Sequence, residues 1–203
     1  MAGIEWDELP FRVRPDLTPY LIHLTRGTEN EDGFTALDNL LSILEDGEIT
    51  GSEPSKAYIK GKRRAACFMD IPFGALKYLW VEPEKAKYEP YGIVVAKPWA
   101  YDHGARPVLY LSDDELAQLC IPKDEWWRVV RLEKEGDYWT SWLHEREWRC
   151  PDDFKLPSNP AVLVKTAKDI TKLQDALAKP DASFKCRPRT ILPLHVICQG
   201  LAG

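Results

Sequence analysis

The apolar residues of this chain fall mostly in short runs of strand length, each ended by a proline, a glycine or a charged residue. Such runs occupy residues 19–25, 65–71, 92–96, 107–111, 145–150, 161–164 and 191–198. Runs of this length are typical of short strands. They do not alternate regularly with helical patterns, so a parallel βαβ sheet is not indicated. The sequence therefore predicts an α+β fold.

Two segments carry the spacing of amphipathic helices. Residues 35–46 place their leucines on one helical face, with Thr35 and Asp38 forming a capping box and Gly47 providing a stop. Residues 168–178 repeat this spacing and end before Pro180. Ser112 is expected to cap a further helix. Residues 73–80 are expected to form a short helix. The stretch between the predicted strands 92–96 and 107–111 is expected to form a loop. Residues 125–143 fit neither template. Pro193 moves the last strand towards a sheet edge.

The length of 203 residues favours one domain. We predict an irregular arm over 1–17, with Trp6 and Phe11 as docking points, and a single domain over 18–203. No apolar run is long enough to cross a bilayer, and residues 1–8 lack the features of a signal peptide. The five cysteines are odd in number and widely spaced. This spacing is typical of a reducing compartment, and we expect a cytoplasmic protein without membrane contact.

Charge is distributed unevenly along the chain. The net charge is −5, which argues against a general nucleic-acid clamp. From Lys165 onward seven Lys and Arg stand against three Asp, a local +4, so the preceding part carries −5 − 4 = −9. A solvated basic helix and tail would explain the contrast. Cys186, His195 and Cys198 form only a loose set of metal ligands, and no metal is expected.

The first candidate for chemistry is the pair His23 and Thr25. They are two residues apart in a predicted strand, so their side chains share one face. A neutral imidazole at this place can bind a ribose hydroxyl, with Thr25 beside it. The alternative is a core histidine whose polar atoms are satisfied by the backbone.

The second candidate is the string of residues 142–149. In a strand, Glu145, Glu147 and Arg149 would share one face, and Arg146 and Trp148 the other. Two carboxylates this close raise each other's pKa unless a cation intervenes. Such a pair suits a site where one carboxylate orients a ribose and the other supports an oxocarbenium ion. The alternative is an exposed strand face with paired charges.

The remaining patterns are less specific. Residues 97–110 mix aromatics with cations, a composition suited to a flat ring and a phosphate, and the basic residues 60–64 can also hold phosphate. Packed or solvated surface loops are the alternatives. Of the eight tryptophans, Trp99, Trp142 and Trp148 lie within or near these strings. No P-loop, GxGxxG, HExxH or GxSxG motif occurs, which disfavours P-loop enzymes, dinucleotide folds and serine hydrolases.

Taken in order, several segments resemble a known family. They are residues 21–25, 41–49, 67–72, 91–93, Lys97 with Trp99, 104–110 and 145–149. Together they resemble the AbiGi-like abortive-infection proteins of bacterial phage defence. More distantly, they resemble the ADP-ribosyltransferase-like fold of the DarT toxins. The resemblance covers about residues 20 to 150.

This resemblance implies a fold of short mixed or antiparallel strands in two small sheets with flanking helices, and an NAD-binding cleft between the sheets. His23 and Thr25 match the first-strand motif that contacts the ribose. Glu147 matches the carboxylate that holds the ribose 2′-hydroxyl and stabilises the transition state, and Glu145 the one that orients the acceptor.

The resemblance also implies cofactor contacts by Tyr91 and Arg149. The aromatic that stacks on nicotinamide stays open among four residues, Tyr58, Phe68, Tyr78 and Tyr91.

The implied function is phage defence by a protein that binds NAD as a substrate, and either transfers ADP-ribose to a protein or nucleic acid or cleaves NAD. The alternative is a non-catalytic, antitoxin-like partner of a toxin, which would use an acidic body to bind a basic partner. A metal-dependent nuclease using Asp70, Glu145 and Glu147 ranks third, because no spacing ties these acids into a magnesium site.

Overall fold

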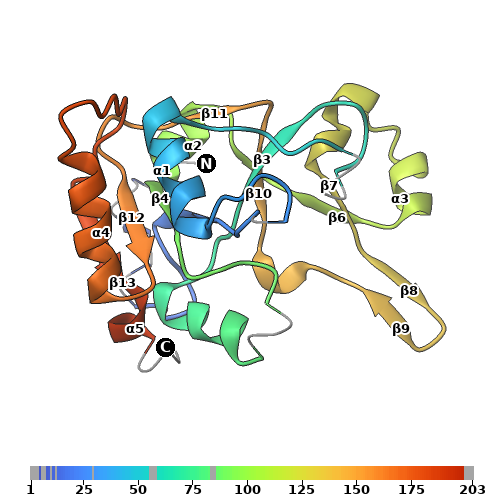
Figure 1. Cartoon of the computed structure of the whole chain (residues 1–203). Coiled ribbons are helices and arrows are strands. Elements are labelled where there is room, and N and C mark those ends of the chain that lie inside the picture. Colours follow the sequence, from blue (N-terminus) through green and yellow to red (C-terminus); the bar gives the residue numbers. More distant parts are fainter. Residues whose placement is uncertain are drawn as a thin grey trace.

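The computed structural model describes residues 5, 8, 9, 11, 13–28, 30–54, 59–82 and 86–198. Its largest sheet has four strands in the order β1 (Tyr20–Leu24), β4 (Gly92–Ala96), β12 (Ala161–Val164) and β13 (Thr190–Pro193) (Figure 1). The β1–β4 and β4–β12 pairs are antiparallel, and β12–β13 is parallel. Pro193 therefore lies in an edge strand, as predicted, where its missing N–H leaves no central ladder position unpaired.

Two helices cover one face of this sheet. The leucines of α1 (Ala36–Asp46) and α4 (Ala167–Leu177) pack with Leu21, Ile93 and Val162 in one buried cluster. The capping box of Thr35 and Asp38 is present, and Gly47 ends α1 in the left-handed conformation at φ 68°. The pattern at residues 35–46 thus predicts α1 correctly, including its last residue, Asp46.

The opposite face is covered by shorter elements. The 3-10 helix Phe73–Trp80 and α5 (Leu194–Ile197) contribute Leu76 and Leu194 to a second cluster with Ile22 and Leu163. Alternate residues of β1 thus enter different clusters, as the two-residue period of a strand requires.

A second sheet has the order β3 (Ala65–Phe68), β10 (Trp148–Pro151) and β5 (Arg106–Pro107), all antiparallel. It joins the first through an isolated bridge in which Ile22 N–H donates to Met69 O at 3.0 Å and Met69 N–H to Ile22 O at 2.7 Å. This bridge brings the strand that carries His23 beside the end of β3, and β3 pairs with β10, the strand that follows the carboxylates.

Three two-stranded sheets complete the described part of the chain. They are β2 (Glu48–Ile49) with β11 (Phe154–Lys155), β6 (Leu109–Leu111) with β7 (Val129–Arg131), and β8 (Glu133–Glu135) with β9 (Tyr138–Thr140). The β8–β9 hairpin extends away from the body (Figure 1). The fold is a mixture of helices and several small sheets, so the expected division into two sheets is too simple.

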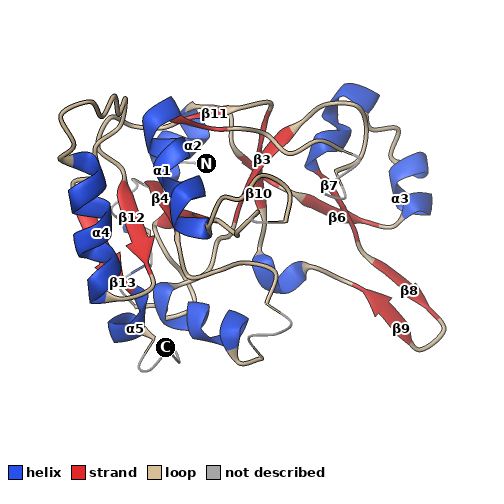
Figure 2. Ribbon diagram, in the orientation of Figure 1, coloured by secondary structure: helices blue, strands red, loops and turns tan. Residues whose placement is uncertain are grey.

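Several local predictions are wrong. Residues 97–102 form helix α2 (Lys97–Asp102) rather than a loop, because Pro98 stands at a first-turn position where its fixed φ is favourable (Figure 2). Residues 125–143, for which the sequence left the structure open, include β7 and the β8–β9 hairpin. Residues 194–197 form α5 instead of continuing the last strand. The expected helix after Ser112 is present as α3 (Asp113–Gln118), with its own capping box.

The described part of the arm contacts the body. The Phe11 ring lies 5.5 Å from Lys97 Nζ. Trp6, the other expected docking point, lies outside the described residues. The division into arm and domain stays a prediction. Among the described residues, no helix has the length and apolarity needed to cross a bilayer.

Candidate functional site

A cavity of about 540 Å³ opens where the two main sheets meet. This volume is within the range of small-molecule sites. The cavity draws its walls from segments far apart in sequence, and its polar lining includes His23, Lys87, Trp142, Glu145, Glu147 and Arg149. Four of the six residues that we proposed for the site are therefore brought together.

His23 projects from β1 and is half-buried. Its Nδ1 lies 2.8 Å from the carbonyl oxygen of Cys67. A carbonyl oxygen only accepts, so Nδ1 carries the proton and Nε2 is left as an acceptor. Burial lowers the pKa of His23, and the hydrogen bond to Cys67 opposes this shift. The site thus holds a neutral imidazole, as the sequence led us to expect.

The backbone of His23 depends on a glycine in the neighbouring strand. A Cβ atom placed on Gly92 would lie 2.3 Å from the carbonyl oxygen of His23. Real Cβ contacts are never this short, so β4 can approach β1 closely only with glycine at this position.

Glu147 and Arg149 form a buried bidentate pair. Arg149 Nε donates to Glu147 Oε1 at 2.8 Å, and a terminal nitrogen donates to Oε2 at 3.1 Å. The other terminal nitrogen donates to Trp127 O at 3.0 Å, and only 3% of the Arg149 side chain is exposed. Desolvation opposes the charge of Arg149, but Glu147 and Cys67 together outweigh it and raise the pKa of the guanidinium.

Glu145 has a different environment, although it lies two residues away. It ends a 3-10 turn, Leu143–Glu145, and is 8% exposed. Within the described residues, its carboxylate has no hydrogen bond or ion pair. Burial raises the pKa of Glu145; Lys87 opposes the shift and Glu147 adds to it. The cavity therefore holds one carboxylate fixed by a cation and one without a direct partner.

Arg146 lies between these two glutamates. Its conformation explains why residues 145–147 do not form the predicted strand, although Glu145 and Glu147 do point in the same direction, as predicted. Arg146 has φ 44°, in the left-handed region, and β10 begins only at Trp148. The turn nevertheless sends Glu145 and Glu147 into the cavity. Arg146 and Trp148 contact Asp70 instead.

Aromatic and cationic groups line another part of the cavity. Lys87 Nζ lies 4.9 Å from the Tyr88 ring centre and 5.2 Å from that of Trp142. Desolvation opposes the charge of Lys87, but Tyr88 and the two cavity glutamates outweigh it and raise its pKa. Arg26 also lines the cavity, and no carboxylate in the described part of the chain pairs with it. Arg26, Lys87 and Tyr88 are the functional candidates that the sequence analysis missed.

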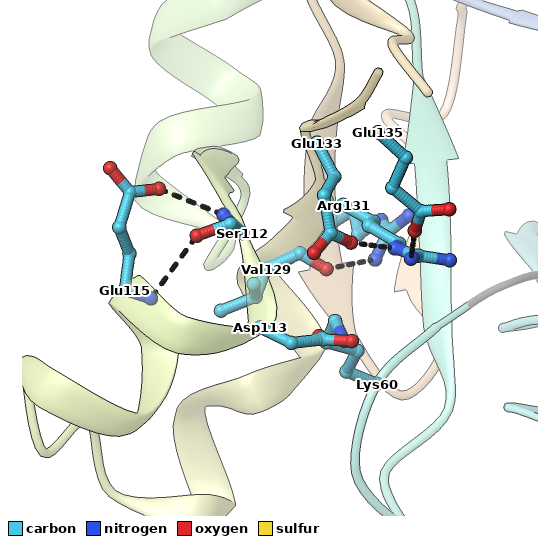
Figure 3. Close-up of polar contacts among 9 residues, drawn as sticks. Lys60, Ser112, Asp113, Glu115, Val129, Arg131, Glu133 and Glu135 are labelled. Carbon is cyan, nitrogen blue, oxygen red and sulfur yellow. Dashed lines mark hydrogen bonds and ion pairs between the residues drawn. The ribbon is translucent and has the colours of Figure 1, made fainter. Parts of the chain in front are cut away.

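Arg131, a fourth cation of the lining, is already paired with carboxylates. Arg131 donates to Glu133 and, at 2.8 Å, to Glu135 (Figure 3). Asp113, at the start of α3, pairs with Lys60 in the same region. The charge of Arg131, which lines the cavity from β7, is therefore already paired with the acids of β8, and Arg131 is less available to an anionic ligand than Arg26.

The structure does not bring Thr25 and Tyr91 to this cavity. The Thr25 hydroxyl is buried and donates to Ala36 O at 2.8 Å, which ties β1 to the start of α1. Tyr91 packs against the cluster under α1 and α4, where burial and the Asp169 carboxylate raise its pKa to about 12.

Of the other stacking candidates, Phe68 lines the cavity. Tyr78 is 68% exposed and outside the lining, and Tyr58 lies outside the described residues. Trp99 stacks on His103 rather than facing the cavity.

The acidic and thiol groups considered as metal ligands do not gather. Asp70 pairs with Lys97 at 2.8 Å and accepts from Trp148 Nε1 at 3.2 Å, away from the two glutamates. Cys186 and Cys198 belong to separate buried clusters. In the described part of the chain, no group of three or more His, Cys, Asp or Glu is arranged to hold a metal.

Comparisons with known proteins add one likeness. No family model matches the chain, the AbiGi-like family included, and no curated protein matches its sequence. Among solved structures, the fold is similar to "Thermus sp. 2.9 DarT in complex with carba-NAD+". The identity is 18%, the TM-score is 0.45, and the match covers 87% of this chain and 96% of that one. A likeness at this level does not establish a shared site.

Proposed function

We propose that the cavity binds NAD⁺ and promotes cleavage of the bond between nicotinamide and ribose, with ADP-ribose passing to an acceptor or to water. One observation carries this proposal. His23 of β1 and the carboxylates Glu145 and Glu147 line the same cavity, as the sequence resemblance requires of an NAD-cleaving site.

The carboxylates suit the charge changes of this reaction. Nicotinamide leaves as a neutral ring, and positive charge develops on the ribose. Fixed negative charge near that carbon lowers the energy of the transition state. Each carboxylate oxygen has two lone pairs, so Glu147 can accept from a ribose hydroxyl while Arg149 holds its position. Glu145, which has no such cation pair, is suited to take a proton from the acceptor.

The remaining lining groups suit the other parts of NAD⁺. Nε2 of His23 is an acceptor for a ribose hydroxyl. The rings of Trp142 and Tyr88 offer flat surfaces for a heteroaromatic ring. Lys87 and Arg26 provide positive charge for the pyrophosphate.

Binding and turnover test the proposal. NAD⁺ is titrated against the protein by calorimetry, and free nicotinamide is measured by chromatography. We expect release by the wild type and a rate lower by about 10²–10⁴-fold in Glu145→Gln, the usual range for loss of an acid–base group. Glu45→Gln is the matched control, because Glu45 is exposed on α1 and lies outside the cavity lining. Absence of binding at millimolar NAD⁺, or unchanged rates in both Glu145→Gln and Glu147→Gln, would refute the proposal.

The pH dependence gives a second test. The raised pKa of Glu145 places the acidic limb of the rate profile above the ordinary glutamate value of about 4.3. This limb should vanish in Glu145→Gln and persist in Glu45→Gln.

The phage-defence role and the identity of the acceptor are also proposals. Radiolabelled NAD⁺ incubated with host protein and nucleic acid distinguishes the cases, because label enters one polymer during transfer and neither during hydrolysis. Phage survival is compared between cells that express the wild type and cells that express Glu147→Gln. Equal survival of the two would contradict a defence role based on this cavity.

A second candidate function is non-catalytic binding of a partner protein. It is favoured by the β8–β9 hairpin, where Tyr138 is 84% and Trp139 is 64% exposed. A partner that co-purifies equally with wild type and Glu147→Gln, but not with Trp139→Ser, would support it.

A further inference from the structure

We propose that Arg146 is a positioning residue, which holds the turn that aims Glu145 and Glu147 into the cavity. The inference rests on the proposed function, but part of it is testable without NAD⁺. It starts from the position of Arg146 between the two glutamates and outside the cavity lining.

The backbone of Arg146 is in an unfavourable conformation. Its φ of 44° and ψ of 53° lie in the left-handed region, which residues with a side chain rarely adopt. The residue ends the turn Leu143–Glu145, and its N–H donates to Leu143 O at 3.1 Å. Interactions elsewhere must hold this conformation in place.

The side chain of Arg146 supplies those interactions. Its Nε donates to the carbonyl oxygen of Asp70 at 2.7 Å, and a terminal nitrogen donates to the carbonyl oxygen of Asp16. The N–H of Asp70 donates in turn to the carbonyl oxygen of Glu145 at 3.2 Å. The Asp70 peptide groups therefore grip the turn at two points, one on the backbone of Glu145 and one on the Arg146 guanidinium.

Asp70 is itself well fixed. Its carboxylate pairs with Lys97 at 2.8 Å and accepts from Trp148 Nε1 at 3.2 Å. Trp148 is the first residue of β10, so both ends of the segment 145–148 are tied to Asp70. Asp16 belongs to the arm, so the arm also contacts Arg146 and helps to hold the turn. A rigid support of this kind places reacting groups, and loss of it lowers turnover more than binding.

The test uses Arg146→Gly, because glycine adopts the left-handed conformation freely and only the guanidinium contacts are lost. Cys120→Gly is the matched control, since Cys120 has φ 51°, is exposed and lies outside the lining. Far-ultraviolet circular dichroism checks folding. If Arg146→Gly does not fold, Arg146→Lys, which loses the forked donor, takes its place.

The first readout is independent of NAD⁺. Titration of the carboxyl ¹³C resonance of Glu145, assigned with Glu145→Gln, measures its pKa beside Lys87, Glu147, His144 and Arg149. We expect this pKa to move towards that of free glutamate in Arg146→Gly, because the released turn exposes the carboxyl to water, and not to move in Cys120→Gly. An unchanged pKa would overturn the inference, whatever the wild-type activity.

The second readout is kinetic. For nicotinamide release we expect kcat to fall at least tenfold in Arg146→Gly and KM to change less than threefold. A rise in KM with kcat unchanged would overturn the positioning role. A kcat equal to that of Cys120→Gly would overturn it as well. If the wild type releases no nicotinamide, the proposed function fails, and the titration alone decides whether Arg146 positions the carboxylate.

Discussion

The two cavity glutamates should have opposite effects on stability when their charge is removed. Glu147 neutralises Arg149, whose side chain is 3% exposed. Glu147→Gln keeps the shape and one acceptor oxygen, but leaves the guanidinium buried without a counter-ion. Breaking a buried pair from one side costs about 3–5 kcal/mol. Because Arg149 keeps its bonds to Trp127 O and Val129 O, we expect about 3 kcal/mol, at the lower end of this range.

Glu145→Gln should not destabilise the protein at pH 7. The folded pKa of Glu145 is raised by burial, so the folded state binds its proton more tightly than the unfolded chain. Stability from this group is therefore full below the unfolded pKa, and declines as pH rises through the folded pKa. At pH 7 the charged carboxylate opposes folding, and its removal leaves stability unchanged or slightly higher.

Urea unfolding followed by tryptophan fluorescence measures both changes in the free energy of unfolding and the m-value, and thermal unfolding followed by circular dichroism measures the Tm. At the expected value, the Tm of Glu147→Gln should fall by roughly 6–12 °C for a chain of this size, with an unchanged m-value. Glu45→Gln serves as the exposed control. Two results would contradict this reasoning. One is a free energy of unfolding for Glu147→Gln within about 0.5 kcal/mol of the wild-type value. The other is an equal loss of stability in Glu147→Gln and Glu145→Gln, which would show that the two carboxylates do not differ in their pairing with a cation.

Three further predictions concern the scaffold. Gly92→Ala should destabilise the protein by about 2 kcal/mol or more, because the added Cβ would lie 2.3 Å from His23 O. Calorimetry measures this change, and a Tm equal to that of the wild type would contradict the close approach of β4 to β1. Among the five free thiols, Cys120 should react first with Ellman's reagent in the native protein, because it is exposed, whereas burial raises the pKa of Cys67 to about 12; Cys120→Ser should abolish the fast phase. Thr35→Ala should cost about 1 kcal/mol through loss of the α1 cap; an unchanged urea midpoint would count against that cap.

Local signals in the sequence are strong enough to predict the elements that depend on them alone. The capping residues and leucine spacing predict α1, and Ser112 predicts the start of α3. The apolar run at 92–96 predicts β4 at the residues where it is found. Pairing is not local, however. Which strands join into one sheet depends on contacts such as Ile22 with Met69, and no pattern in either segment specifies the other.

The candidate site was predicted in part for the same reason. The alternation of Glu145, Glu147 and Arg149 correctly predicted a shared direction, although a left-handed turn at Arg146, not a strand, produces it. Thr25 directly follows the strand that carries His23, but its hydroxyl donates to Ala36 O at the start of α1. Lys87 and Tyr88 lie in irregular chain, where no periodicity indicates which side faces a cavity.

The β8–β9 hairpin also marks a place where the protein can be divided. Its turn is exposed, and a Cβ on Gly136 would meet nothing within 4 Å. A cut there leaves His23 and Lys87 on one fragment and both glutamates with Arg149 on the other. Neither fragment then contains a complete cavity lining. Fusing the two halves to proteins that associate on demand would make any activity of this cavity depend on their reunion, and would convert the chain into a two-part reporter.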